Sequence, residues 1–294
     1  MLFKIFRVYL VNNSKTMAKA VAKVFDKKAR VLPSEIKREA DILASLSHPG
    51  VIEFKELAEQ IKLSYSSGKY RYETALLTEY APEGDFHDFL EEFGPFPEDL
   101  ARLYFKQMIQ IVEFIHSNNI AHRDLKPENF VLTKEFALKL CDFGSASLSK
   151  DDGKFEGFIG TDAYLAPEFH LKKHFDGKKL DIFACGVILF VILVGFRPFT
   201  VAKSDDVYYS PLIRNSPQDF WKLHEQNSDS PKQISLSKEA KDLICKMLAS
   251  DPEKRLTPSE ILAHEWFKGE TVKQSEIKQR LHEINIEKFQ SLSC

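Results

Sequence analysis

The sequence predicts an α+β protein with two lobes, a small β-rich lobe around one helix followed by a larger, mostly helical lobe. Ala18 to Phe25 alternates in polarity as a half-buried strand does. Pro97 to Ser117 instead repeats apolar residues at the spacing of a helix that is buried on one side. Ile182 to Phe196 carries no charge and is shorter than the roughly 20 residues that cross a bilayer, so it suits the centre of a helical lobe.

Within the first strand, successive side chains point to opposite faces of the sheet. Val21 and Lys23 therefore share one face, and the small apolar residues between them share the other. Lys23 is placed beside an apolar contact surface, an arrangement that suits a lysine that binds phosphate.

A helix is predicted after Pro33 and Ser34, with Ile36, Ala40 and Leu43 turned inward. Glu39 falls within this buried stripe. A buried carboxylate needs a cationic partner, and Lys23 is the obvious candidate. The alternative is an ordinary, half-exposed pair of Glu and Lys.

Three segments are predicted: residues 1–80, 81–268 and 269–294. A strand from Leu76 to Ala81 is predicted, and the Pro82-Glu83-Gly84 that follows it is typical of a hinge between lobes. The last segment has Ile277, Leu281 and Ile284 at helical spacing, which predicts a helix docked on the second lobe. A calmodulin-binding element is the alternative, but the basic residues are balanced by glutamates and form no basic face.

Composition excludes several classes of protein. The chain has 294 residues and a formal net charge of −2, which gives no support for nucleic-acid binding. Met1 to Val11 is broken by Lys4 and Arg7 and shows no cleavage signal, so we expect a strand rather than a signal peptide, and no membrane segment. The four cysteines lie far apart without metal-ligand spacing, which predicts free thiols in a reducing, cytoplasmic setting: Cys141, Cys185, Cys245 and Cys294.

The most informative segment reads His-Arg-Asp-Leu-Lys-Pro-Glu-Asn from His122 to Asn129, followed by Asp142-Phe143-Gly144. Asp124 can accept a proton from a hydroxyl, and Lys126 can reach a phosphate that is being transferred. Asn129 and Asp142 offer the oxygen ligands that Mg²⁺ prefers when phosphates supply the rest of its coordination. These residues predict phosphoryl transfer.

The chain resembles the eukaryotic protein kinase superfamily over Val8 to Phe267. Besides the catalytic segment, Val21-Ala22-Lys23 resembles the lysine motif of the third strand of kinases, and Glu39 stands where kinases carry its partner. The resemblance also marks Asp181 as an anchor of the helical lobe and Arg255 as the ion partner of Glu168. It implies ATP and Mg²⁺ as cofactors, and a kinase domain as the fold.

The resemblance implies a Ser/Thr acceptor on protein substrates, because Lys126 and Thr161 follow the pattern of serine/threonine kinases. Thr161 is thereby grouped with Asp124, Lys126 and Asn129 as catalytic. The end of the second lobe, from Arg255 to Phe267, is similar to the calcium/calmodulin-dependent and AMP-activated branch. We expect a monomer.

The resemblance also implies a nucleotide site between the lobes. Val8 and Val21 would lie against adenine, with Thr78 behind it and the backbone of Glu79 and Ala81 as hinge contacts. Asp85 would lie near the ribose. The remaining residues of the site are charged and would lie near the phosphates and the metal: Lys23, Glu39 and Asp142.

The start of the chain departs from the family pattern. Counting back from Lys23, the three glycines that cover the phosphates of ATP should fall at Met1, Phe3 and Phe6, and none of these is glycine. The small lobe is therefore expected to be truncated at this loop. Two explanations stay open: a start that clips the natural chain, or a short form with weak nucleotide clamping. The second leaves an alternative function, a catalytically impaired pseudokinase that acts as a nucleotide-responsive scaffold.

The predicted activation segment, from Ser145 to Ile159, is short. The residue at the usual activating phosphorylation site is Gly157. The neighbouring Glu156 could supply a fixed negative charge for Arg123, which ordinarily binds that phosphate. The alternative is that Glu156 is an ordinary solvated loop charge.

Overall fold

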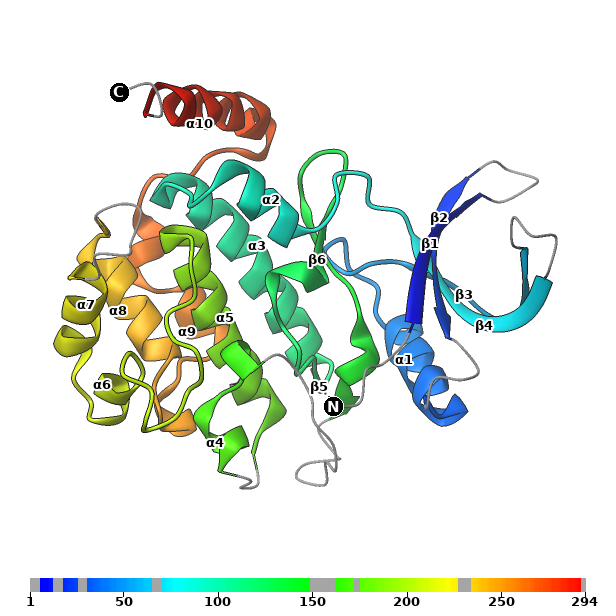
Figure 1. Cartoon of the computed structure of the whole chain (residues 1–294), viewed down its shortest axis with the longest axis horizontal. Coiled ribbons are helices and arrows are strands. Elements are labelled where there is room, and N and C mark those ends of the chain that lie inside the picture. Colours follow the sequence, from blue (N-terminus) through cyan, green and yellow to red (C-terminus); the bar gives the residue numbers. More distant parts are fainter. Residues whose placement is uncertain are drawn as a thin grey trace.

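The computed structural model describes residues 6–12, 18–25, 31–64, 70–148, 162–171, 175–226 and 234–291. A four-stranded sheet with one helix forms the smaller lobe, and helices form most of the larger lobe (Figure 1). The predicted α+β, two-lobed architecture is confirmed.

The sheet is antiparallel, with strand order β1-β2-β4-β3. Its strands are β1 (Phe6–Asn12), β2 (Lys19–Phe25), β3 (Phe54–Ser64) and β4 (Tyr70–Glu79). On β2 the pleat separates Ala22 and Val24, which pack with Ala75 in a small cluster, from Lys23 on the other face. The cleft side of the sheet thus receives Lys23.

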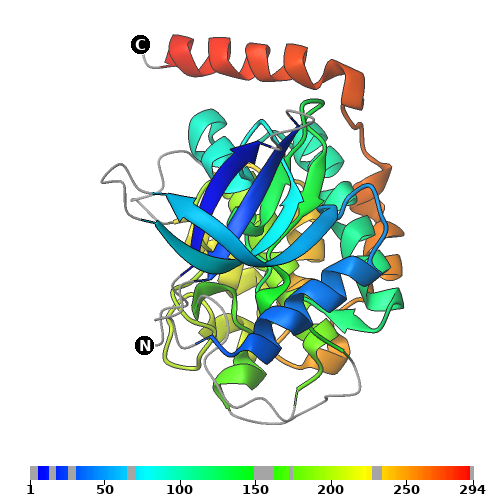
Figure 2. The ribbon, with the colours of Figure 1, turned by 90° about the vertical axis from the view of Figure 1, so that its right-hand side faces the viewer.

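Helix α1 (Pro33–Ser45) packs against β3 and is the helix predicted after Pro33 (Figure 2). Pro33 occupies its first turn, where a missing backbone N–H costs nothing. Its buried residues include Ile36, Ala40, Leu43 and Glu39, so the carboxylate lies on the inner side as expected. Glu39 is only 4% exposed.

The strand predicted from Leu76 to Ala81 corresponds to β4, and both of its predicted ends were wrong. β4 begins at Tyr70, six residues before Leu76, and ends at Glu79 rather than Ala81. Its first half alternates polar and aromatic residues that reach solvent, such as Tyr70 and Tyr72, so it lacks the apolar run that marks a buried strand. Pairing with β2 and β3 creates the strand there.

Helix α5 (Gly177–Val194) forms the centre of the larger lobe and is buried along nearly its whole length. It packs against α3 (Glu98–Ser117) and α8 (Lys238–Met247). An apolar surface all round is what a helix needs when neighbours cover every side. Shorter helices complete the lobe: α2 (Phe86–Phe93), α4 (Pro167–His170), α6 (Ser210–Ile213), α7 (Pro217–Glu225) and α9 (Pro258–Leu262). No helix in the described part of the chain is both long and apolar enough to span a membrane.

Two small strand pairs lie at the junction of the lobes. β5 (Ile120–Ala121) pairs with β8 (Ser147–Leu148), and β6 (Phe130–Leu132) pairs with β7 (Leu138–Leu140). The segment between β5 and β6 contains His122 to Asn129, and the segment between β7 and β8 contains Asp142. Because β5 pairs with β8 and β6 pairs with β7, the two loops lie side by side.

Helix α10 (Ile277–Ser291) follows the larger lobe and packs beside α2 (Figure 1). Ile277, Leu281 and Ile284 are buried, as the spacing predicted. Arg280 Nε is 3.1 Å from Asp99 Oδ2 on α3. Apolar burial and this ion pair dock the helix on the lobe.

Candidate active site

Asp181 on α5 anchors the loop from His122 to Asn129. Its side chain is buried, with Asp181 only 1% exposed. The carboxylate of Asp181 accepts the backbone N–H of His122 at 2.8 Å and that of Arg123 at 2.7 Å. Its Oδ2 also accepts from Nε2 of His116 at 2.9 Å. Arg123 has a φ of 64°, a left-handed conformation that is unfavourable for a residue with a side chain, so these bonds stabilise a strained turn.

The turn presents Asp124, Lys126 and Asn129 together. Lys126 Nζ is 3.0 Å from Asp124 Oδ2. The amide nitrogen of Asn129 donates to the backbone oxygen of Asp124 at 2.7 Å and lies 3.4 Å from Asp124 Oδ2. Because the nitrogen faces Asp124, the Asn129 amide oxygen is left for another partner.

The second loop is joined to the first through backbone atoms. The N–H of Cys141 donates to the carbonyl of Asn129 at 2.8 Å, and His122 Nε2 donates to the carbonyl of Cys141 at 3.1 Å. Asp142 has a φ of 57°, and Phe143 after it is 1% exposed, edge-on to His122. Burial of the Phe143 ring therefore fixes where the Asp142 carboxylate points.

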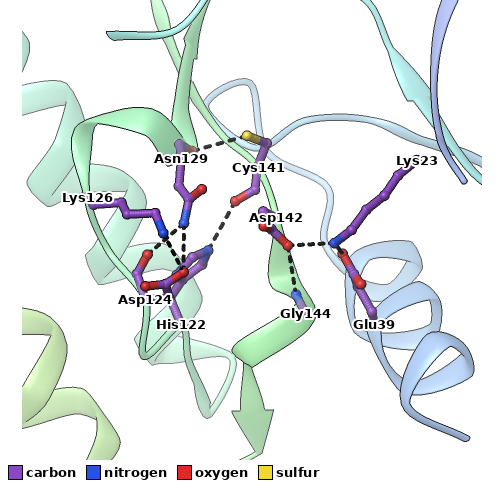
Figure 3. A network of polar contacts seen from close by, with 9 residues as sticks. All are labelled: Lys23, Glu39, His122, Asp124, Lys126, Asn129, Cys141, Asp142 and Gly144. Carbon is purple, nitrogen blue, oxygen red and sulfur yellow. Dashed lines mark hydrogen bonds and ion pairs between the residues drawn. The ribbon is translucent and has the colours of Figure 1, made fainter. Parts of the chain in front are cut away.

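Lys23, Glu39 and Asp142 meet at the cleft (Figure 3). Lys23 Nζ is 2.6 Å from Glu39 Oε1 and 2.6 Å from Asp142 Oδ1. The predicted pair between Lys23 and Glu39 is present. The contact with Asp142 could not be predicted, because no pattern links residues so distant in the chain.

Interactions with neighbouring charges determine the direction of the pKa shifts of Lys23 and Asp142. Burial lowers the pKa of Lys23, but the carboxylates of Asp142 and Glu39 outweigh burial and raise the pKa above its ordinary value. Burial likewise raises the pKa of Asp142, but Lys23 outweighs it and brings that pKa to about 2. Lys23 and Asp142 are therefore both ionised at neutral pH.

Asn129 and Asp142 suit a magnesium ion in the type of donor they offer. Asn129 offers an amide oxygen and Asp142 offers a carboxylate. Among the described residues, no three His, Cys, Asp or Glu side chains come together as a metal site. A site with few protein ligands is what Mg²⁺ uses when nucleotide phosphates and water complete its coordination.

The residues predicted to line the nucleotide lie along the sheet and the hinge. Val8 pairs with Lys23 across β1 and β2, and Val21 pairs with Thr78 across β2 and β4. Val8 is 59% exposed. The remaining three follow each other at the end of β4 and the start of α2: Glu79, Ala81 and Asp85.

Two of these hinge residues already carry structural bonds. The backbone N–H of Glu79 donates to the carbonyl of Glu53 at 3.0 Å. Asp85 precedes α2, and its carboxylate accepts the N–H of Asp88 at 3.0 Å, which caps the helix. The N–H of Glu79 and the carboxylate of Asp85 therefore already have partners within the fold.

Thr161, Glu156 and Gly157 lie outside the described residues, so their predicted roles stay predictions. Just after them, Glu168 on α4 forms a buried pair with Arg255, with distances of 2.6 and 2.7 Å between two nitrogens and two oxygens. This is the ion pair that the sequence predicted. The fork geometry of the guanidinium matches the carboxylate.

Two contacts of the site were missed at the level of sequence. The ring of Phe6 lies 4.5 Å from Lys23 Nζ, and the Glu79 carboxylate pairs with Lys139 on β7. Phe6 lies at one of the expected glycine positions, which was the only available signal. A groove of about 550 Å³ lies elsewhere, between α3 and the turn at His48, and includes none of the residues of the catalytic cluster.

Comparison with known proteins places these observations in a family. Residues 4–267 match the profile described as "Protein kinase domain". The chain is 36% identical over 269 residues to "CBL-interacting serine/threonine-protein kinase 12" of Arabidopsis thaliana, covering 89% of this chain and 50% of that protein. It is 36% identical over 274 residues to "CBL-interacting protein kinase 30" of Oryza sativa subsp. japonica, covering 91% and 52%.

The chain covers a larger share of a third relative. The chain is 33% identical over 264 residues to "Serine/threonine-protein kinase SRK2E" of Arabidopsis thaliana, covering 89% of this chain and 68% of that protein. These relatives agree with the predicted calcium/calmodulin-dependent and AMP-activated branch. The chain spans about half the length of the first two relatives.

Proposed function

This chain belongs to the protein kinase family, and from that membership we propose that it is a serine/threonine kinase that transfers the γ-phosphate of ATP to hydroxyls of protein substrates. The observation that carries the proposal is the single cluster in which the cleft lysine, its glutamate and both catalytic loops meet (Figure 3). Members of the family use these positions for phosphoryl transfer.

Asp124 is proposed to accept the proton of the incoming Ser or Thr hydroxyl. The amide of Asn129 and the ammonium of Lys126 hold its carboxylate from two sides, at 3.4 and 3.0 Å from Oδ2. A base that is fixed in place before the substrate arrives requires little reorganisation during the reaction. Lys126 is close enough to share its charge between Asp124 and the transferred phosphate, and Thr161 is proposed to act beside them.

Lys23 is proposed to bind the phosphates of ATP, with Glu39 holding its ammonium in the cleft. Asn129 and Asp142 would hold Mg²⁺, which when bound neutralises charge on the phosphates. Because Lys23 keeps the pKa of Asp142 near 2, this ligand is deprotonated at any physiological pH. Asp142 therefore carries its negative charge before a metal ion binds.

The base of the nucleotide is proposed to lie between Val8 and Val21, with Thr78 at the back. Since the N–H of Glu79 is bonded to Glu53, the Glu79 carbonyl is the atom that would accept from adenine, and Ala81 would donate. Asp85 would meet the ribose from the start of α2.

We also propose a monomeric, cytoplasmic enzyme that binds neither nucleic acid nor membranes. The net charge of −2 and the scattered cysteines support this. Two of the relatives are named for interaction with CBL, but these are proteins about twice as long, and a partner of that kind is not assigned to this chain.

The test is transfer of labelled phosphate from ATP with Mg²⁺ to generic protein substrates. Asp124→Asn is expected to abolish transfer and to leave nucleotide binding intact, because the change removes the base and preserves the shape. Lys37→Ala, in an exposed ion pair on the outer side of α1, is the matched control that retains transfer. Stabilisation of the protein by nucleotide with no transfer in the unmodified chain would identify a scaffold instead.

A further inference from the structure

Phe6 begins β1 on the face of the sheet that forms the cleft. It pairs with Phe25 across β2, while Val8 pairs with Lys23. Directly paired residues share a face, and alternate residues of one strand share a face. Phe6, Val8 and Lys23 therefore all project toward the cleft.

The ring of Phe6 lies over the ammonium of Lys23, with 4.5 Å between Nζ and the ring centre. This is within the range of a cation–π interaction. Glu39 and Asp142 each accept from the same nitrogen at 2.6 Å. An ammonium has three hydrogens, so the two carboxylates take two of its bonding directions. The ring of Phe6, and more distantly that of Phe25 at 5.6 Å, lie beside the same nitrogen.

The contact also closes the space around Lys23. On the side of α1, Phe6, Lys23 and Ile36 are among the residues that border a cavity of only about 10 Å³. A single water molecule needs at least roughly 10–15 Å³ of such volume. The ring of Phe6 also lies over the ammonium, where a phosphate would have to bind, and the negative face of the ring repels an anion.

We infer that Phe6 is a gate on the phosphate side of the nucleotide site, and that the phosphates of ATP must displace its ring to reach Lys23. The inference rests on the proposed function, since it assumes that Lys23 binds phosphate. In place of a glycine that lets the backbone approach the phosphates, the chain has a side chain that competes with them. The ring acts on the phosphates alone, because the base lies further along β1 and β2.

The experiment measures the binding of MgATP and of adenosine, which has no phosphates, by calorimetry on the full chain. Phe6→Ala is expected to tighten MgATP binding by about threefold to tenfold, the range of one cation–π contact. Adenosine affinity is expected to stay within about twofold. Phe6→Leu keeps apolar bulk without the aromatic face and should give a smaller gain.

Leu10→Ala is the matched control, because Leu10 lies on the same face of the same strand but pairs with Val21 and does not lie beside Lys23. Removing it should leave the ratio of the two affinities unchanged. If Phe6→Ala weakens MgATP binding or changes both ligands equally, the gate is refuted, since the ring would then be part of the nucleotide pocket or of the fold.

A failure of the proposed function would give different results from a failure of the gate. If neither the unmodified chain nor Phe6→Ala binds adenosine or MgATP, there is no nucleotide site and both proposals are wrong. If the unmodified chain binds MgATP and transfers phosphate by way of Asp124, while Phe6→Ala brings no gain, only the gate is wrong.

Discussion

Glu79, the last residue of β4, is held by Lys139 of β7 through an ion pair between Oε1 and Nζ. The same Oε1 accepts the backbone N–H of Glu53 at 2.8 Å. One carboxylate thus ties the end of the sheet to the strand that leads into Asp142. The pair lies behind the hinge, and its side chains are 24% and 16% exposed.

Lys139→Met is expected to lower the free energy of unfolding by about 1 kcal/mol, because Glu79 keeps one hydrogen bond and loses its charge partner. Urea denaturation measures this. Lys37→Met is the control, since Lys37 and Asp41 are both well exposed and their pair should contribute no more than about 0.5 kcal/mol. Equal losses in the two variants would mean that the hinge pair is an ordinary surface pair.

Asp181→Asn is expected to reduce phosphate transfer by about 100-fold, since an amide cannot accept the N–H groups of His122 and Arg123 with both of its heavy atoms and the catalytic loop shifts. Adenosine binding should change little, because the residues proposed to contact the base lie on the sheet and the hinge. Steady-state kinetics and calorimetry measure the two effects.

Asp176→Asn on the same helix is the control for the catalytic-loop prediction. Asp176 precedes α5 and caps it by accepting the N–H of Lys178 at 2.8 Å, a role that Asn fills equally well. Transfer should be unchanged. A similar loss in both variants would show that the charge of the helix, and not the anchoring of the loop, controls activity.

Arg255→Met is expected to destabilise the larger lobe by about 3–5 kcal/mol, because the Glu168 carboxylate would remain buried without its partner. Glu168→Gln should cost less, since the amide oxygen still accepts from the guanidinium. Thermal and urea unfolding rank the two variants. The opposite order would mean that burying Arg255 beside a neutral amide costs more than burying Glu168 without its partner, which would contradict this prediction.

His224 predicts a pH dependence of stability. It is 1% exposed among Phe190, Tyr208 and Trp221, and its burial lowers its pKa to about 4 from 6.5. Above pH 6.5 the side chain is neutral in both states, so stability is unaffected. As pH falls from 6.5 to 4, only the unfolded chain gains the proton, and stability should drop by about 3 kcal/mol before it levels off.

His224→Phe removes the titrating group and keeps an aromatic ring in the cluster. Subtracting the unfolding free energies of this variant from those of the unmodified chain isolates His224 from other groups that titrate in acid. This difference should fall by about 3 kcal/mol as pH decreases from 6.5 to 4. Parallel curves would show that His224 titrates normally.

Local spacing explains why much of the site could be predicted. Asp124, Lys126 and Asn129 lie in one turn, so their order along the chain places them together. Glu39 could be assigned to the buried side of α1 from its helical position, and Lys23 to the cleft face of β2 from strand alternation. These inferences use only the periods of helix and strand, which do not depend on the rest of the fold.

Contacts between distant segments were not predictable in the same way. Asp142 meets Lys23 because Phe143 is buried beneath it, and that burial depends on the packing of the whole larger lobe. The strand from Tyr70 has no apolar signal and exists because β2 and β3 pair with it. The Glu79 and Lys139 pair joins two elements whose distance is set by the hinge.

From the amino-acid order alone follow the two-lobed α+β class, the catalytic turn and the faces on which Lys23 and Glu39 lie, since each depends on residues close together in the chain. Only the tertiary structure decided that Lys23 contacts Asp142 and that Phe6 covers it. The physical reason is that a strand or helix period selects the side of an element, while the partner on that side is chosen by how separate elements pack.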